Sequence, residues 1–247
     1  MCCRLGNTVL ALAVVGIVAA AFAALADHHG GAYEGIPDGY RLVYSTDFEA
    51  DGAIGDWVFS DADAWRIGSE GGNKYLEHNE QSDYSPPNRS PLNIALLAEL
   101  ELADFVLEAD LKQTGRDYGH RDMCTFFGFQ NPAHFYYSHV ATAMDDHAHN
   151  IFLVDNAPRH KISTHTTAGY EWGENEWHRL RLVRDSKTGE TAIYLNDMTT
   201  PVQTASTGYL DWGRVGFGSF DDTGRIDNVR VYAPYVKQSK PGFFEGK

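Results

Sequence analysis

The sequence predicts an all-β domain built as a two-sheet sandwich or a barrel. Apolar and polar residues alternate in short segments, turn-forming residues separate these segments, and almost no stretch after the first 26 residues has the apolar spacing of a helix. The alternation gives each strand one buried face and one solvated face. About eleven such segments follow one another, and that many strands in one domain close into a sandwich or a barrel.

The predicted strands can be followed in order along the chain. They are RLVYSTDFE, WRIGSEGGNKYLEH, FVLEADLKQT, CTFFGFQ, HFYYSHVA, HNIFLVD, KISTHTT, WHRLRLVRD, TAIYLND, RVGFGSF and IDNVRVYA. In FVLEADLK, the four odd-numbered residues from 105 to 111 are apolar, and these are expected to face the core. In RDSKTGETAIYLND, Gly189 supplies the positive φ that a tight hairpin turn needs.

The N-terminus has the pattern of a secretory signal peptide. One basic residue, Arg4, precedes a long apolar run, and the small-residue ending Ala24-Leu25-Ala26 comes just before Asp27. This pattern predicts cleavage after residue 26 and a secreted or periplasmic protein. An uncleaved membrane anchor is the alternative, because the apolar run approaches the length that spans a bilayer.

The rest of the chain is predicted to be one domain with short flanking segments. The sandwich is expected over residues 41–235, between a flexible N-terminal segment at 27–40 and a C-terminal tail at 236–247. After cleavage Cys124 is the only cysteine, so the core must hold the domain without an internal disulfide. The formal charge of −14 argues against nucleic acid and anionic lipid as partners, and it is compatible with cation binding.

Four segments of the sequence, in this order, carry a family resemblance: YSTDFEADGAIGDWVFSDADAWRI, FVLEADLK, NEWHRLRLVRDSKTGETAIYLND and GRVGFGSFDDTGRIDNVRVY. Over residues 41–233 the chain resembles the concanavalin A-like lectin/glucanase superfamily, and within it most of all the laminin-G-like and 3-keto-disaccharide-hydrolase-like domains of secreted bacterial proteins. The resemblance implies a concanavalin A-like jelly-roll sandwich of two antiparallel sheets, with a concave face that often receives sugar. Lectins, hydrolases, lyases and adhesion modules all use this fold, so it does not assign a function by itself.

The resemblance also implies a calcium site that ties the first and last strands together. The matching positions are Glu49 and Asp51, facing Asp227. Carboxylate oxygens on converging strand ends are suitable calcium ligands. The alternative is that these acids cap turns and pair with Arg225 or Arg230.

One catalytic motif of the superfamily is incomplete here. The segment EADLKQ begins like the Glu-x-Asp-x-x-Glu strand of retaining glucanases, but Gln113 stands where the second glutamate would be. Glu108 and Asp110 share a face, yet retaining hydrolysis needs two carboxyl groups about 5 Å apart, one of them a protonated acid. The sequence therefore argues against glucanase chemistry of that type.

Histidine is concentrated in one part of the chain. Residues 119–154 hold five of the 11 histidines, among aromatic and apolar residues of consecutive predicted strands. Residues two apart point the same way in a strand, and neighbouring strands place such pairs side by side. The pairs are His120 with Asp122, Tyr137 with His139, and His147 with His149. We expect the three pairs to converge on one patch.

Such a patch has two chemical interpretations and a structural one. Imidazole and carboxylate groups bind zinc, manganese or iron, and they also abstract a proton beside a carbonyl group. The resemblance to 3-keto-sugar enzymes adds a substrate in which the ketone acidifies the neighbouring carbon. A histidine base, a cation that holds the enolate, and an arginine such as Arg121 or Arg159 would then suffice for elimination of the glycosidic oxygen. The catalytic candidates are His139, His120, Asp122, Arg121 and His149. The structural alternative is that the histidines are hydrogen-bonded rungs of a sheet, since no tight metal-ligand spacing is present.

Aromatic residues favour a sugar ligand under either interpretation, because the C–H face of a pyranose packs on an aromatic ring. Trp172, in the loop AGYEWGENEW, is expected to be exposed, with Tyr170 beside it; the alternative is that both close the end of the sandwich. The ligand-binding candidates are Tyr137, Trp172, Tyr170, Arg159 and Glu108. In GSFDDTGRIDN, Asp221 and Asp222 form a turn and could also stand at the rim of the patch.

These observations predict a secreted β-sandwich that binds carbohydrate on a concave face rich in histidine and aromatic residues. The first alternative is a hydrolase or lyase of 3-keto-glycosides that uses the histidine and acid cluster, with or without a transition metal. The second alternative is a laminin-G-type domain for protein adhesion, which would present an exposed apolar patch instead of a polar concavity.

Overall fold

The structure is a computed structural model that describes residues 35–239 and residue 244. The predicted signal peptide at 1–26 lies outside the described residues, as does the greater part of the segment 27–40. In the described part of the chain, the helices are two short 3-10 turns, η1 (Ala53–Asp56) and η2 (Ala62–Ala64). No described helix has the length and apolar character that crossing a bilayer requires.

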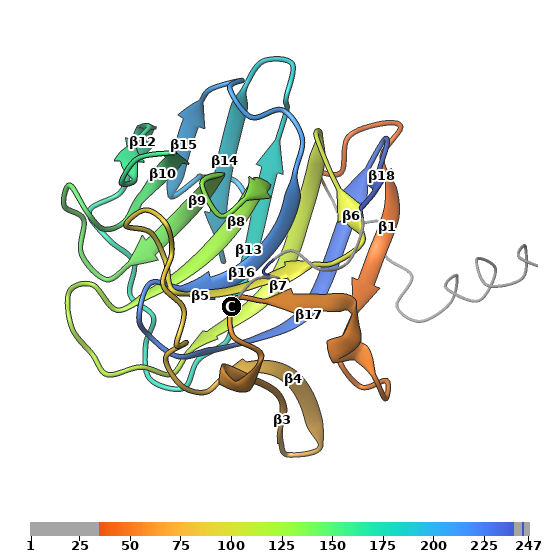
Figure 1. Ribbon diagram of the computed structural model, residues 1–247, viewed down its shortest axis with the longest axis vertical. Helices are drawn as coiled ribbons and strands as arrows, with labels where there is room; N and C mark the ends of the chain where they lie inside the picture. Colours follow the sequence, from red (N-terminus) through yellow and green to blue (C-terminus); the bar gives the residue numbers. More distant parts are fainter. Residues whose placement is uncertain (1–34, 240–243, 245–247) are drawn as a thin grey trace, which may run out of the picture. The chain divides into compact units, whose positions relative to one another are not determined.

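Two antiparallel sheets account for most of the described chain (Figure 1). The nine-stranded sheet contains, in spatial order, β12 (Ser163–Thr166), β15 (Gln203–Ser206), β14 (Glu190–Leu195), β13 (His178–Arg184), β7 (Phe105–Gln113), β17 (Gly224–Ala233), β4 (Asn73–His78) and β3 (Trp65–Glu70), and β1 (Arg41–Thr46) pairs with β17 off this path. The seven-stranded sheet contains β11 (His160–Lys161), β10 (Asn150–Asp155), β9 (His134–Ala141), β8 (Asp122–Asn131), β16 (Arg214–Ser219), β5 (Asn93–Leu97) and β2 (Trp57–Phe59). A small third sheet joins β6 (Leu100–Glu101) to β18 (Lys237–Gln238), so pairing reaches into the segment expected to be a tail.

The main core lies between the two large sheets. The apolar residues of β7, from Phe105 to Leu111, contribute to it together with Leu180 and Leu182 of β13 and Phe217 of β16. The strand FVLEADLK therefore buries the face that its alternation predicts, and register pairing of β7 with β13 places Leu107 opposite Leu182.

A second apolar cluster covers the outer face of the seven-stranded sheet. Its buried members are Ile94, Leu96, Cys124, Phe126, Phe129, Phe135, Tyr137, Phe152 and Val154. Tyr84, from the long segment 79–92 between β4 and β5, packs against the cluster together with Phe244. The segment 79–92 crosses in front of the strands in Figure 1, and the backbone N–H of Arg159 donates to the carbonyl of Arg89 within it. Strands β8, β9 and β10 are thus buried on both faces.

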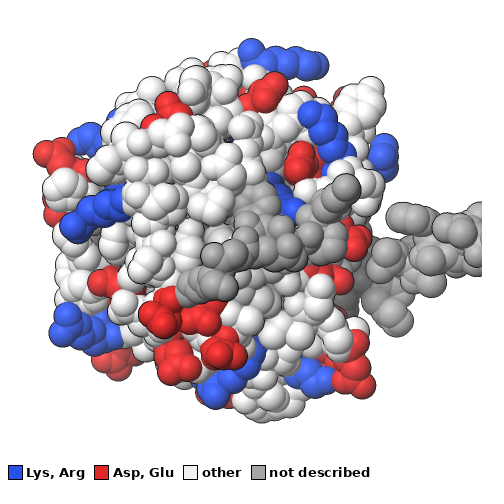
Figure 2. Space-filling view, viewed as in Figure 1, with Lys and Arg blue, Asp and Glu red and all other residues white. Residues whose placement is uncertain are grey.

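The outer face of the nine-stranded sheet is polar and carries ion pairs. Glu108 of β7 is buried, and its carboxylate accepts hydrogen bonds from Arg181 Nη2 at 2.7 Å and Arg179 Nη2 at 3.0 Å. Glu108 therefore forms ion pairs within the sheet and is not free to bind a ligand, in contrast to its prediction as a ligand-binding residue. On the opposite side of the molecule, which Figure 2 shows, acidic side chains gather below the centre and basic ones stand mostly around the rim.

Replacing Glu108 by alanine is expected to lower the free energy of unfolding by about 3 kcal/mol or more, because it removes the buried carboxylate that Arg179 and Arg181 share. Urea unfolding at neutral pH measures this loss. The control is Glu190→Ala, which removes an exposed acid of the same sheet that has no ion pair among the described residues. The control is expected to change the stability by about 0.5 kcal/mol at most. Equal small losses in both variants would contradict the role assigned to Glu108.

Candidate functional site

Three polar residues meet inside the second apolar cluster, and we call them the buried triad: Asp122, Cys124 and His139. Cys124 of β8 lies directly opposite His139 of β9, and Asp122 precedes Cys124 by two residues on the same face. The Cys124 thiol donates to Asp122 Oδ2 at 3.1 Å, and His139 Nε2 lies 3.5 Å from the same oxygen. The triad residues are at most 2% exposed. The predicted approach of His139 to Asp122 is therefore confirmed, but in the interior of the protein.

The hydrogen bonds of His139 fix where its proton lies. The backbone N–H of His149 donates to His139 Nδ1 at 3.2 Å, so the proton of a neutral ring is on Nε2 and points toward Asp122. Burial, followed by the charge of Arg159, lowers the pKa of His139 to about 3. Burial and then the charge of Asp222 raise the pKa of Asp122. In this tautomer Nε2 offers a proton and no lone pair, which disfavours a metal ion between the three side chains.

Tyr137 and Arg159 lie around the triad. Tyr137 precedes His139 by two residues on β9, and its buried hydroxyl group has no hydrogen-bond partner among the described residues. The Arg159 guanidinium stacks on the ring of Phe220, 4.3 Å from the centroid, and on Phe152 at 5.4 Å. Tyr137 is fully buried. The face of the seven-stranded sheet that was predicted to bind sugar is therefore closed to solvent.

The other catalytic candidates point elsewhere. His120 is exposed in the turn before β8, where its Nε2 contacts Asp145 Oδ2 at 2.6 Å. Arg121 is buried but donates to the side chain of Gln113 and to the carbonyl of Gly173. His149 has a positive φ of 53°, which turns its ring away from the triad, and Nε2 contacts the hydroxyl group of Thr167 at 2.8 Å. The prediction that all three pairs converge on one patch is wrong.

The loop predicted to present aromatic rings instead closes one end of the sandwich. Trp172 is 1% exposed, so its predicted exposure is wrong. Its ring meets that of Tyr170 edge to face at 5.1 Å, and the Tyr170 hydroxyl group lies 2.7 Å from His178 Nδ1. The alternative interpretation of these two aromatic residues is the correct one.

The three acids predicted to bind calcium have separate partners. Glu49 Oε1 accepts the backbone N–H of Lys74 at 2.6 Å, and Asp51 lies 3.7 Å from the Lys74 ammonium group. Asp227 accepts a hydrogen bond from Asn73 at 2.9 Å. Among the described residues, these three acids do not lie close enough together to hold one metal ion. Another group of acids, Asp122, Asp221 and Asp222, does lie close enough together. The calcium ion itself stays a prediction.

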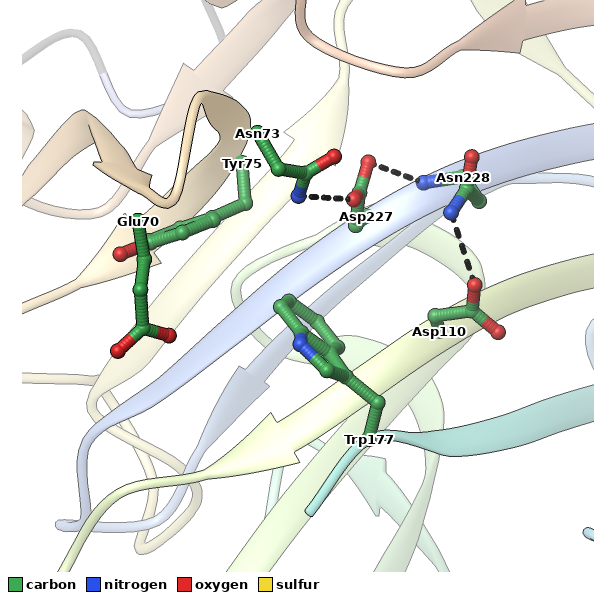
Figure 3. A pocket seen from close by; sticks show the side chains of 7 residues that line it. All are labelled: Glu70, Asn73, Tyr75, Asp110, Trp177, Asp227 and Asn228. Carbon is green, nitrogen blue, oxygen red and sulfur yellow. Dashed lines mark hydrogen bonds between the residues drawn. The ribbon is translucent and has the colours of Figure 1, made fainter. Parts of the chain in front are cut away.

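An open pocket lies on the outer face of the nine-stranded sheet, and we call it the Trp177 pocket (Figure 3). Its volume is about 360 Å³. It is lined by Glu70, Asn73, Tyr75, Asp110, Trp177, Asp227 and Asn228. These residues come from β4, β7, β17 and the end of β3, together with the residue just before β13.

The pocket forms where β17 changes its neighbour. On one edge, β17 pairs with β4 through Ile226 and with β1 from Val229 onward. On the other edge, its register with β7 shifts between Asp227 and Arg230, and Asn228 adopts a positive φ of 51°. An irregularity of this kind bends a strand and re-aims its side chains. Here it directs Asp227 and Asn228 into the gap (Figure 3).

Polar groups in the pocket are held in a fixed row. Asn73 Nδ2 donates to Asp227 Oδ2 at 2.9 Å, the backbone N–H of Asn228 donates to Asp227 Oδ1 at 2.6 Å, and Asn228 Nδ2 donates to Asp110 Oδ2 at 2.9 Å. Burial raises the pKa of Asp227, and the charge of Asp110 adds to the rise. Trp177 is 36% exposed and meets the ring of Tyr75 edge to face at 5.9 Å. The pocket thus combines an accessible indole ring with ordered hydrogen-bonding groups.

The sequence contains a signal for Trp177 that our prediction did not use. In WHRLRLVRD the alternation buries His178, Leu180 and Leu182 and therefore places Trp177 on the polar face. The acids of the pocket carry no comparable signal, because they depend on the register shift in β17.

Neither a protein-family model nor a curated protein sequence matches the chain. Solved structures do match it. The carbohydrate-binding module CBM66 from Bacillus subtilis is 17% identical, with a TM-score of 0.51, over 72% of this chain and 96% of that one. The winged bean acidic lectin, solved with methyl-α-D-galactose, is 16% identical, with a TM-score of 0.50, over 81% of this chain and all of that one. The predicted concanavalin A-like jelly-roll sandwich is therefore confirmed as the fold.

Acidification is expected to destabilise the protein between about pH 6.5 and pH 4, through its buried histidines. Burial is the main cause that lowers the pKa of His78 and His149 to about 4 and that of His139 to about 3. In the unfolded chain a histidine titrates near 6.5. The unfolded state therefore takes up protons first as the pH falls, and stability present above about pH 6.5 is lost.

The His139→Gln variant tests this linkage. The slope of unfolding free energy against pH is expected to decrease by about 1.4 kcal/mol per pH unit, the effect of one proton. Asp122 and Asp222 have raised pKa values and act with the opposite sign, so the difference between variant and wild type is the quantity to measure. His165→Gln, at an exposed position, serves as control. An unchanged slope in His139→Gln would show that His139 is not held neutral by the fold.

Proposed function

We propose that the protein binds carbohydrate and that the Trp177 pocket is the binding site. The observation that carries this proposal is an accessible tryptophan ring beside fixed carboxylate and amide groups in an open pocket. The C–H face of a sugar ring packs on an indole ring, and the sugar hydroxyl groups exchange hydrogen bonds with acids and amides. A cavity of about 360 Å³ is within the size range of small-molecule sites.

The aromatic inventory supports this choice of site. Trp57, Trp65 and Trp172 are buried, and Trp212 is partly buried with the Lys237 ammonium group 3.7 Å from its ring centroid. Trp177 is exposed and next to polar groups. Asp110 and Asn228 present an acceptor and a donor at the floor of the pocket, on the same side as the indole ring (Figure 3). A ligand resting on Trp177 would therefore meet both kinds of group without any rearrangement of the sheet.

The fold comparison supports the same class of ligand. A carbohydrate-binding module and a lectin solved with a galactoside share this fold with the chain. Export through the predicted signal peptide would bring the protein to extracellular or periplasmic glycans. Carbohydrate binding therefore agrees with the fold, the pocket and the predicted location.

The alternative function, cleavage of 3-keto-glycosides by the histidine cluster, has less support. Its base, His139, is 2% exposed and directs its Nε2 proton toward Asp122. His120 and His149, which the mechanism would also use, are engaged with Asp145 and Thr167. Catalysis at that place would require the apolar cover of the sheet to open.

The Trp177→Ala variant is expected to weaken glycan binding by about tenfold or more, because it removes the ring on which the sugar rests. Affinity electrophoresis against a panel of soluble polysaccharides, followed by calorimetry on those that bind, measures the loss. Tyr235→Ala is the matched control, since Tyr235 is 74% exposed and lies away from the pocket residues. Thermal unfolding of each variant verifies the fold. Wild-type affinity in Trp177→Ala would rule out the pocket as the site.

A further inference from the structure

We propose that the Trp177 pocket selects sugars that carry a free, protonated amino group, in preference to neutral, N-acylated or acidic sugars. This inference rests on the proposed function, because it names the class of glycan that the same pocket binds. It follows from the charges that line the pocket and from how each of them is partnered.

The lining residues include three acids and no lysine, arginine or histidine. One of the acids is already neutralised from outside the pocket. Glu70 Oε2 lies 3.1 Å from the Lys112 ammonium group and 3.0 Å from Arg225 Nη1. Glu70 therefore closes the wall of the pocket as part of an ion-pair network.

The other two acids, Asp110 and Asp227, are hydrogen-bonded but not ion-paired in the described part of the chain. Arg179 stands opposite Asp110 in the register of β13 and β7, but its guanidinium group pairs with Glu108 at 3.0 Å. Among residues 35–239 and 244, no lysine, arginine or histidine forms an ion pair with either of them. Their hydrogen-bond partners are neutral groups of Asn73 and Asn228. The two acids stand opposite each other in the register of β17 and β7, where side chains are about 5 Å apart. Their mutual repulsion would be relieved by a positive charge from a ligand.

An ammonium group fits this arrangement better than a metal ion. Both oxygens of Asp227 and one oxygen of Asp110 accept hydrogen bonds, and Asn228, which donates to both acids, stands between the two carboxylates (Figure 3). A calcium ion needs six to eight oxygen ligands, which this row does not provide. A primary ammonium group needs only a few acceptors, and Asp110 keeps its second oxygen for one.

The indole ring favours the same ligand. The face of a tryptophan ring attracts cations. The Lys112 ammonium group, 5.6 Å from the Trp177 centroid, is itself paired with Glu70 at 3.1 Å. An amino sugar would rest its C–H face on the ring and direct its ammonium group toward Asp110. A uronic acid or sulfated sugar would bring a negative charge beside two carboxylates that form no ion pair among the described residues, so the pocket would disfavour it.

Calorimetry with matched oligosaccharides tests the inference. The probes are glucosamine oligomers and N-acetylglucosamine oligomers of equal length, titrated into the full chain near pH 6 with EDTA present. We expect the amino oligomer to bind about tenfold more tightly or better, since the added contact is a hydrogen bond between charged groups. We also expect this preference to shrink in high salt.

Variants assign the preference to the pocket. Asp110→Asn is expected to bring the ratio of the two dissociation constants to about one, because it removes the carboxylate with the accessible oxygen. Glu190→Gln, which removes an exposed acid outside the pocket, is the matched control and is expected to keep the wild-type ratio. A wild-type preference in Asp110→Asn would overturn the inference.

The outcomes separate this inference from the proposed function. Neutral glycans that bind as tightly as amino glycans, with loss of binding in Trp177→Ala, would overturn the charge preference and leave carbohydrate binding in place. Binding that requires calcium and disappears in EDTA would overturn it as well. Failure of every glycan to bind in a Trp177-dependent way would overturn both.

Discussion

Burial of both faces of the seven-stranded sheet is the constraint on which the rest of the structure depends. One face packs on the nine-stranded sheet, and the other is covered by Tyr84 of the segment 79–92 and by Phe244. Polar groups on the covered face must be neutral or paired, since an isolated charge there would be very costly. That requirement explains why His139 is neutral and hydrogen-bonded to its own sheet. It also leaves the nine-stranded sheet to present the open site.

The solvated face of the nine-stranded sheet is organised by charge. A continuous chain of ion pairs joins, in order, Arg66, Glu77, Arg225, Glu70 and Lys112. It crosses β3, β4, β17 and β7, so it ties the projecting β3–β4 hairpin, seen at the lower edge of Figure 1, to the body of the sheet. Networks of several charges contribute more than isolated surface pairs. Glu70, in the wall of the Trp177 pocket, is therefore part of this network, while the floor acids Asp110 and Asp227 stay outside it.

Strand periodicity predicted the fold and part of the site, and it failed where the backbone departs from it. The period of two correctly placed Asp122, Tyr137 and His139 on one face. It misplaced His149, whose positive φ reverses its direction. It could not reveal the cover of that face, because the segment 79–92 has no strand pattern. The nearly continuous apolar strands of 122–155 nevertheless carry a signal, since strands of that kind are buried on both sides.

The floor of the Trp177 pocket is a costly place to keep an acid. Burial raises the pKa of Asp227, so ionisation of this acid opposes folding, and stability is lost as the pH rises through its folded pKa. Asn228 beside it holds a left-handed conformation, which also costs free energy. Both costs arise at the point where β17 stops pairing with β4 and begins to pair with β1. A regular strand with apolar side chains would close this junction. In the described part of the chain, an irregular strand that places an acid without an ion pair in the same pocket as an exposed indole ring is better explained by a ligand than by sheet packing.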